Sequence, residues 1–307
     1  MPNSANSDLS RLPDPWPNKH LSKTLGINNL DWHYQISTHP SPVARSILLI
    51  HGTGSSCHSW ENILPILAQN YTVMAVDLPG HGYTTGALKE QLHIQEIAKE
   101  LQALLLKLHW HTPNVIIGHS AGTNCALALA LLDQINQPEL MIGLNPSLIS
   151  PPSLYNFFIG PLINPIFTST MMAHFLANSI PITGMIDKLL NSTNSDLTAS
   201  QRLQYKTLFK QTNHIHGSMN FMAASNIPEL LSASDNLKGL MTFLVTENDP
   251  WVPQTSLQPI IQKYFPKATV IVKPGGHLFH EANPKDTLQI IQSAIQQLPS
   301  KPVKEYA

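Results

Sequence analysis

The chain has 307 residues, of which 42% are hydrophobic, and this length is enough for a large core domain with an insertion. Charged residues make up only 12% of the sequence, roughly half of the usual share, and the formal net charge is −1. This near-neutral composition provides no basic surface for nucleic acid and no electrostatic preference for acidic substrates or anionic lipid.

The sequence carries no clear targeting or redox signal. Residues 1–20 are polar and proline-rich and lack the basic and apolar regions of a secretory signal, so we expect a surface arm there. The sequence contains no uninterrupted apolar run of about 18 residues, so we expect no membrane span. Cys57 and Cys125 indicate neither a disulfide framework nor a structural zinc site. We therefore expect a cytoplasmic protein.

Hydrophobic patterns predict most of the secondary structure. Residues 30–37 alternate between apolar and polar, which predicts a half-exposed antiparallel strand. Continuous apolar runs, typical of parallel strands covered on both faces, lie at 46–50, 72–76, 114–118, 140–144, 241–245 and 269–272. Helix-length segments between most of them lie at 92–109, 121–134, 254–264 and 284–297. This alternation predicts an α/β fold with a doubly wound, mostly parallel sheet.

The alternation of strand and helix stops between residues 146 and 225. This stretch is rich in proline, Phe, Met, Leu and Ile, and it contains no strand-like run. An insertion between parallel strands predicts a helical cap over their carboxyl ends, where such sheets bind ligands. Its apolar residues either pack the cap onto the core or also line a pocket, and we favour the pocket. The expected division is an arm at 1–20, a core at 21–145 and 226–300, a cap at 146–225 and a tail at 301–307.

Ser120 lies in VIIGHSAGTN, between a predicted strand and a predicted helix. Gly118 and Gly122 would let the strand and the helix approach closely while the serine adopts a strained backbone conformation. Such a turn places the serine Oγ at the top of the sheet, near the positive end of the helix. An ordinary glycine-rich turn is the alternative, and the strand-to-helix context favours a nucleophile.

A serine nucleophile needs a base, and the base needs an acid that orients it. In this architecture both should follow strands later in the chain. Asp249 comes just after the apolar run 241–245, and His277 comes just after the run 269–272. We therefore expect both side chains at the same edge of the sheet as Ser120.

Other ionisable residues compete for these roles. Glu247 is the rival acid and His280 is the rival base, but the glycine pair before His277 suits a tight loop at the site. His119 directly precedes the serine, so we expect it to point away from Oγ and to be structural. Asp77, in DLPGHG, precedes the serine turn in sequence, and we interpret it as structural too.

Acyl transfer also needs two N–H donors aimed at the point where negative charge develops. One should be the backbone N–H of Ala121, directly after the expected nucleophile. The other should come from the loop HGTGSSCHSW, where Thr53 is the first choice and Gly54 the next. The alternative is that this loop is a plain glycine turn. The presence of both this loop and the serine turn in one chain, in the expected order, argues against that alternative.

Five motifs, in chain order, resemble the α/β-hydrolase superfamily across nearly the whole chain: HGTG, DLPGHG, GHSAG, ENDPWVP and GGHLFHE. Four others resemble the α/β hydrolases encoded with bacteriochlorophyll genes and labelled magnesium-chelatase accessory proteins: LPDPWPNK, HGTGSSCHSW, GLNPSL and HGSMNFMAASNIPEL. The resemblance implies (bacterio)chlorophyll biosynthesis, an association with the chelatase machinery, and a tetrapyrrole or its ester as substrate. A Met-rich cap would suit such an irregular apolar ligand.

The favoured hypothesis is a serine hydrolase that cleaves an ester or related acyl bond of a small apolar substrate, with no metal or organic cofactor. The serine argues against dehalogenases and epoxide hydrolases of this superfamily, whose nucleophile is aspartate. Carbon–carbon bond hydrolases, perhydrolases and hydroxynitrile lyases stay open. A hypothesis of another class is an accessory protein that binds a tetrapyrrole without turnover, because fold does not determine function.

Overall fold

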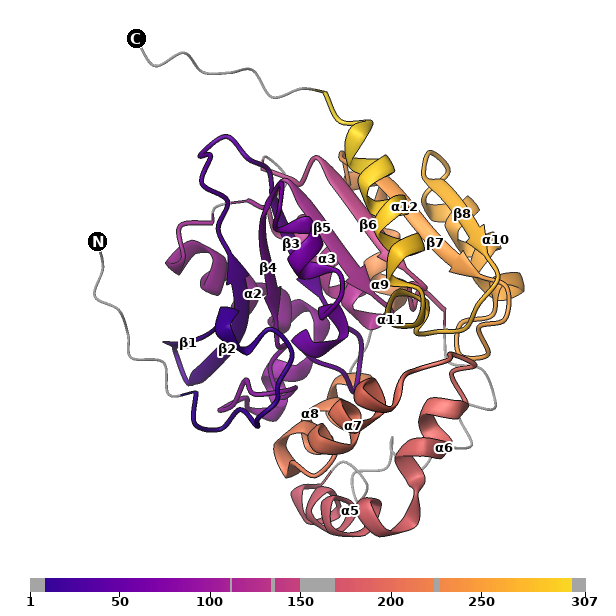
Figure 1. Ribbon diagram of the computed structural model, residues 1–307. Coiled ribbons are helices and arrows are strands. Elements are labelled where there is room, and N and C mark those ends of the chain that lie inside the picture. The colour runs from indigo at the N-terminus through magenta and orange to yellow at the C-terminus, as the bar shows by residue number, and fades with distance from the viewer. Residues whose placement is uncertain (1–8, 111, 134–135, 150–168, 224–226, 300–307) are drawn as a thin grey trace.

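A computed structural model describes residues 9–110, 112–133, 136–149, 169–223 and 227–299. One eight-stranded sheet runs through it in the order β1-β2-β4-β3-β5-β6-β7-β8 (Figure 1). The pairings of β1 with β2 and of β2 with β4 are antiparallel, and those from β4 across to β8 are parallel. The predicted mostly parallel sheet is confirmed. The strands are β1 (Ser22–Ile27), β2 (Leu30–Ser37), β3 (Ser46–Ile50), β4 (Thr72–Val76), β5 (Val115–His119), β6 (Leu140–Leu144), β7 (Leu240–Thr246) and β8 (Thr269–Lys273).

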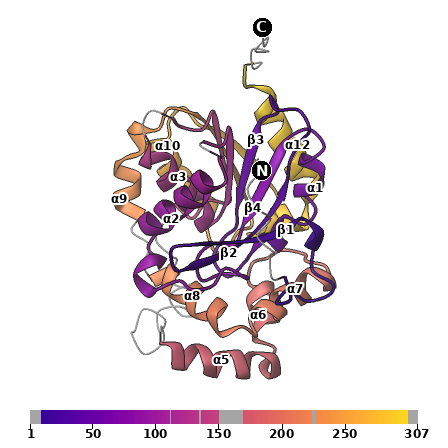
Figure 2. The same ribbon diagram turned by 90° about the vertical axis from the view of Figure 1, so that its left-hand side faces the viewer.

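Helices cover both faces of this sheet (Figure 2). Leu48 and Ile50 of β3 pack into one hydrophobic layer, whereas Ile47 and Leu49 pack into the other. Successive side chains of a strand point to opposite faces, so a continuous apolar strand supplies both layers. One face carries α2 (Ile94–Lys107), α3 (Ala121–Leu132), α9 (Ile227–Ser232) and α10 (Gln254–Tyr264), and the other carries α1 (Leu64–Leu67), α11 (Phe279–Ala282) and α12 (Pro284–Gln296). Short 3-10 helices lie at η1 (Lys19–Leu21), η2 (Cys57–Trp60), η3 (Lys89–Leu92) and η5 (Ser234–Asn236).

The predicted strands and helices of the sheet layers are present, with ends within two residues of the expected bounds. The edge strand β1 was not expected, because SKTLGI offers little hydrophobic pattern. The antiparallel strand expected at 30–37 is present as β2, but the expectation that it is half-exposed is wrong, because most of β2 is buried. Its polar residues His33 and Gln35 are buried and hydrogen-bonded, and the Gln35 amide donates to the Pro17 carbonyl at 2.7 Å. The alternation therefore comes from polar side chains that are buried, His33 against Asp77 and Gln35 against the N-terminal arm.

Between β6 and β7 the described chain forms helices α5 (Thr170–Thr183), α6 (Met185–Asn191), α7 (Ala199–Leu208) and α8 (Thr212–Ala223). They lie together at one end of the sheet, beneath the core in Figures 1 and 2. No helix in the described ranges is both long and apolar enough to cross a membrane. Residues 150–168 of the expected cap lie outside the described residues, as do the start of the arm and the tail, so the domain division stays a prediction.

Candidate active site

Ser120 occupies a sharp turn between β5 and α3, with φ 50° and ψ −122°. A non-glycine residue at positive φ is strained, and such strain is common at functional sites. A Cβ on Gly118 would lie 2.5 Å from the Thr123 backbone nitrogen. A Cβ on Gly122 would lie 2.4 Å from the carbonyl oxygens of Ile50 and His51. Both glycines are therefore needed for strand, turn and helix to pack this closely.

The structure brings Ser120, His277 and Asp249 into one hydrogen-bonded line. His277 Nε2 lies 3.0 Å from Ser120 Oγ, and His277 Nδ1 lies 2.7 Å from Asp249 Oδ2. Asp249 follows β7 and His277 follows β8, so parallel strands deliver both side chains to the edge that carries the serine turn. This arrangement matches the expected geometry of a nucleophile, a base and an orienting acid.

Asp249 is buried but held in its charged form. Burial raises the pKa of Asp249, yet His277 and hydrogen bonds from Val252 and Asn145 outweigh this effect, and the pKa lies below its usual value. Asp249 Oδ1 accepts the backbone N–H groups of Trp251 and Val252 at 2.8 and 2.9 Å. A carboxylate here accepts the Nδ1–H of His277, which leaves Nε2 free to take the Ser120 proton.

Asn145 is a site residue to which sequence reasoning assigned no role. It follows β6 directly, has a φ of 45°, and is buried. Its Nδ2 donates to Asp249 Oδ2 at 2.8 Å and also to Thr246 Oγ1, whose hydroxyl donates to the Gly276 carbonyl. Asn145 therefore connects the acid loop to the loop of His277. The available signal was a polar residue placed just after an apolar strand, inside GLNPSL.

The rival acid and base lie elsewhere. Glu247 is exposed, and its backbone N–H bonds to the Lys273 carbonyl. His280 is buried, with its ring centroid 4.2 Å from that of His119 and 5.0 Å from that of Trp60. Burial, together with the nearby imidazole of His277, lowers the pKa of His280 to about 3, so this imidazole is neutral at physiological pH.

His119 is buried directly behind the site. Its Nε2–H donates to the His277 carbonyl at 2.9 Å, and the two ring centroids are 4.9 Å apart. Its hydrogen bond thus goes to the backbone of the histidine loop, in line with the structural role expected for it.

Asp77 anchors a second buried cluster of hydrogen bonds. Its Oδ1 accepts the Cys57 backbone N–H at 2.6 Å, and its Oδ2 accepts His33 Nδ1 and the Tyr83 backbone N–H, both at 2.8 Å. Within the described ranges, His33, Cys57 and Asp77 are the one trio with donor atoms close enough for a metal ion. Because His33 Nε2 also contacts Ser22 Oγ, protein groups already use the nitrogen and carboxylate atoms. We therefore interpret the trio as structural.

The expected oxyanion loop lies against the serine turn. A Cβ on Gly52 would be 3.0 Å from Ser120 Cβ. Ala121 begins α3, where first-turn N–H groups have no acceptor within the helix. Gly54, with φ +73°, accepts a hydrogen bond from His214 Nε2 of α8 at 3.2 Å. The loop is thus positioned beside Ser120, and the choice of Thr53 as second donor stays a prediction.

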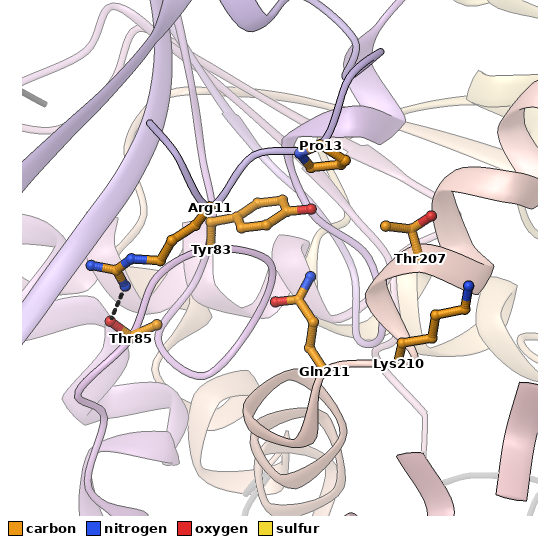
Figure 3. A pocket seen from close by; sticks show the side chains of 7 residues that line it. All are labelled: Arg11, Pro13, Tyr83, Thr85, Thr207, Lys210 and Gln211. Atoms are coloured by element: carbon orange, nitrogen blue, oxygen red, sulfur yellow. Dashed lines mark hydrogen bonds between the residues drawn. The ribbon is translucent and has the colours of Figure 1, made fainter. Parts of the chain in front are cut away.

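A surface pocket of about 400 Å³ lies between the N-terminal arm, the loop after β4 and the turn from α7 to α8 (Figure 3). Arg11 lies on one side of it, where its guanidinium donates to Thr85 Oγ1 at 3.1 Å and also pairs with Asp31 at 2.7 Å. Among the described residues, the lining of this pocket contains none of the expected catalytic residues, so the pocket is not part of the candidate active site. The lining residues are Arg11, Pro13, Tyr83, Thr85, Thr207, Lys210 and Gln211.

Known proteins that are similar to this chain over most of its length include a magnesium-chelatase subunit and a lipase. The Magnesium-chelatase 30 kDa subunit of Rhodobacter capsulatus is 29% identical over 280 residues, covering 89% of this chain and 94% of that protein. It is the kind of relative that the narrower sequence resemblance predicts. An sn-1-specific diacylglycerol lipase of Mus musculus is 24% identical over 262 residues, or 81% of this chain and 80% of that protein.

Solved structures share the fold at lower sequence identity. The enol-lactonase from Burkholderia xenovorans LB400 matches with a TM-score of 0.70 and 15% identity, over 89% of this chain and 100% of that chain. An alpha/beta hydrolase fold protein from Burkholderia ambifaria matches with a TM-score of 0.71 and 18% identity, over 89% and 97%. The model of the alpha/beta hydrolase family matches residues 47–290, which is most of the chain. The chain therefore belongs to the alpha/beta hydrolase family.

Proposed function

We propose that this protein is a serine hydrolase that cleaves an ester or related acyl bond of an apolar substrate. The observation that carries the proposal is the hydrogen-bonded line from Ser120 Oγ through His277 to Asp249, at 3.0 and 2.7 Å. The strained backbone of Ser120 supports it, because a surface serine has no need of a positive φ held by two glycines.

Each group has a defined task in this mechanism. Ser120 Oγ attacks the acyl carbon while His277 Nε2 accepts the hydroxyl proton, and the Asp249 carboxylate stabilises the resulting imidazolium. Backbone N–H groups of Ala121 and Thr53 stabilise the oxyanion. His277 then protonates the leaving group as the acyl-enzyme forms. A water molecule, deprotonated by His277, hydrolyses the acyl-enzyme and restores Ser120.

The proposed substrate class is a tetrapyrrole ester or a comparable apolar acyl compound. The similarity to a magnesium-chelatase subunit supports a link to (bacterio)chlorophyll biosynthesis and to the chelatase machinery. In this proposal the protein works in the cytoplasm, and the region 146–225 is the cap over the site. Its helix α8 contacts the expected oxyanion loop through His214, which supports a cap that lies beside the reacting groups.

A second candidate function is a non-catalytic accessory protein that binds a tetrapyrrole for magnesium chelatase, favoured by the name of the same relative. Retention of pigment through purification, without any release of acid or alcohol from porphyrin methyl esters, would support this candidate. Product analysis on the same esters also separates hydrolysis from carbon–carbon cleavage and from perhydrolysis, which use the same protein groups.

The test is intact-mass labelling with a fluorophosphonate, followed by peptide mapping. We expect one adduct, on Ser120, in the wild type and none in Ser120→Ala. The matched control is Ser232→Ala, which removes an exposed hydroxyl that bonds to the Glu229 carbonyl and should label like the wild type. A folded wild type that takes no label would refute the hydrolase mechanism and favour the binding protein.

A further inference from the structure

Residues Ser192–Ser195 form a polar turn between α6 and α7, which we call the 192–195 turn. In the sequence it is part of NSTNSD, for which the proposed mechanism has no role. Thr193 Oγ1 donates to the Leu190 carbonyl at the start of the turn, and Asn194 adopts a left-handed φ of 53°. Thr193 and Ser195 are also buried, with 3% and 8% of their surfaces exposed.

The 192–195 turn binds the loop that carries the proposed base. The backbone N–H of His277 donates to the Thr193 carbonyl at 2.8 Å, and the backbone N–H of Leu278 donates to Ser195 Oγ at 2.8 Å. A Cβ on Gly276 would lie 2.0 Å from the Asn194 carbonyl oxygen. The turn therefore contacts residues 276, 277 and 278 of the histidine loop in succession. Only glycine fits at position 276, because a side chain there would collide with the Asn194 carbonyl.

The same turn binds the loop that carries the proposed acid. Asn194 Nδ2 donates to the Asn248 carbonyl at 3.0 Å, one residue before Asp249. The indole N–H of Trp251 donates to the Ser192 carbonyl at 3.1 Å. That indole in turn stacks on His277, with ring centroids 5.4 Å apart and an interplanar angle of 22°.

We propose that the 192–195 turn is a positioning element that holds the loops of Asp249 and His277 together, so that the imidazole stays in line with Ser120 Oγ. Ser195 and Asn194 act through the backbone of these loops and do not touch the reacting atoms. The effect on rate rests on the proposed function, whereas the effect on the Asp249–His277 hydrogen bond does not. Because α6 and α7 flank the turn, a movement of these helices would be transmitted to the imidazole.

Ser195→Ala removes the acceptor of the Leu278 N–H, and it also removes the hydrogen bond that the Ser195 hydroxyl donates to the Thr193 carbonyl at 3.2 Å. We expect kcat for p-nitrophenyl butyrate to fall by about 10- to 100-fold, since a misplacement of roughly 1 Å at a catalytic group can cost about 100-fold. KM should change less than about twofold. Ser195→Thr, which keeps a hydroxyl, should recover most of kcat, and the surface variant Ser232→Ala should behave as the wild type.

An activity-independent measurement accompanies the kinetics. The Nδ1–H of His277 in its bond to Asp249 should give a low-field proton resonance in the wild type, identified by its absence in His277→Ala. In Ser195→Ala this resonance should shift or broaden by exchange, and Ser195→Thr should restore it. If it stays unchanged while kcat is within twofold of the wild type, the positioning role is wrong.

Three further outcomes are informative. If Ser195→Ala does not fold, Asn194→Gly replaces it, because glycine accepts the positive φ and the bond to Asn248 is lost; the same resonance and rate criteria then apply. If the wild type takes no fluorophosphonate label but Ser195→Ala disturbs the resonance, the positioning element stands and the proposed hydrolase function fails. If Ser120 is labelled but the variant leaves both resonance and rate undisturbed, the hydrolase function stands and the positioning element fails.

Discussion

Gly122→Ala should damage both stability and activity, because the added methyl group has no space. Its Cβ would lie 2.4 Å from the carbonyl oxygens of Ile50 and His51, roughly 1 Å closer than an ordinary contact of 3.4 Å. Both neighbours are backbone atoms of β3 and its following loop, so they cannot rotate away as a flexible side chain would. The start of α3 must move away from β3 instead.

The size of the effect follows from this displacement. Overpacking of a close-packed core costs about 1–3 kcal/mol of unfolding free energy. The same shift of roughly 1 Å separates the Ala121 N–H from the loop of Thr53, and a misplacement of this size costs about 100-fold in rate. We therefore expect kcat for p-nitrophenyl butyrate to fall by about two orders of magnitude.

Urea unfolding and ester hydrolysis measure the two effects, and Gly26→Ala is the matched control. Gly26 lies on β1, and a Cβ there would meet no atom within 4 Å. This control should keep wild-type activity and unfold within about 0.5 kcal/mol of the wild type. If Gly122→Ala matches Gly26→Ala in both measurements, the packing argument for the serine turn is refuted.

Three other predictions test the surroundings of the site. Asp249→Asn should lower kcat by about 10³–10⁴-fold with little change in KM, because an amide does not hold the required tautomer of His277. Hydrolysis of p-nitrophenyl butyrate measures kcat, and a loss below tenfold would contradict the role proposed for Asp249. Asn145→Ala should reduce the unfolding free energy by about 1–3 kcal/mol at pH 7, since a buried carboxylate loses a donor; an unchanged urea midpoint would count against this. Burial raises the pKa of Glu281 from 4.5 to about 8, although a hydrogen bond from Tyr205 opposes the shift. The folded state therefore retains this proton while the unfolded chain releases it, so the free energy of unfolding falls as pH rises from about 4.5 to 8. Over this window Glu281→Gln should become progressively more stable relative to the wild type. If urea unfolding at several pH values gives parallel stability curves for the two proteins, Glu281 is not neutral in the folded state.

Much of the fold was predictable because its strands are short, apolar and separated by helices. The runs at 46–50 and 72–76 became β3 and β4 without any change of bounds. Such patterns are local, since the side chains of a parallel strand must be apolar on both faces wherever the strand lies in the sheet. β1 escaped prediction because an edge strand needs less apolar surface, and SKTLGI contains little.

The convergence of the three expected catalytic residues was also predictable, for a topological reason. The carboxyl ends of parallel strands share one edge of a sheet, so polar residues that follow β5, β7 and β8 must come close to one another. Ser120, Asp249 and His277 therefore needed only the order of the elements. The burial of β2 was mispredicted, because its alternation does not reveal that His33 would be buried against Asp77 or that Gln35 would bond to the arm.

Local pattern and strand direction are enough to predict most of the sheet, the serine turn and the convergence of the three residues. The contacts that hold these residues in place come from the packing of loops that are far apart in the chain. Asn145 contacts Asp249 across 104 residues, and Ser195 contacts Leu278 across 83. Hydrogen bonds between residues so distant in sequence leave no periodic signal, since each depends on where two separately formed loops meet.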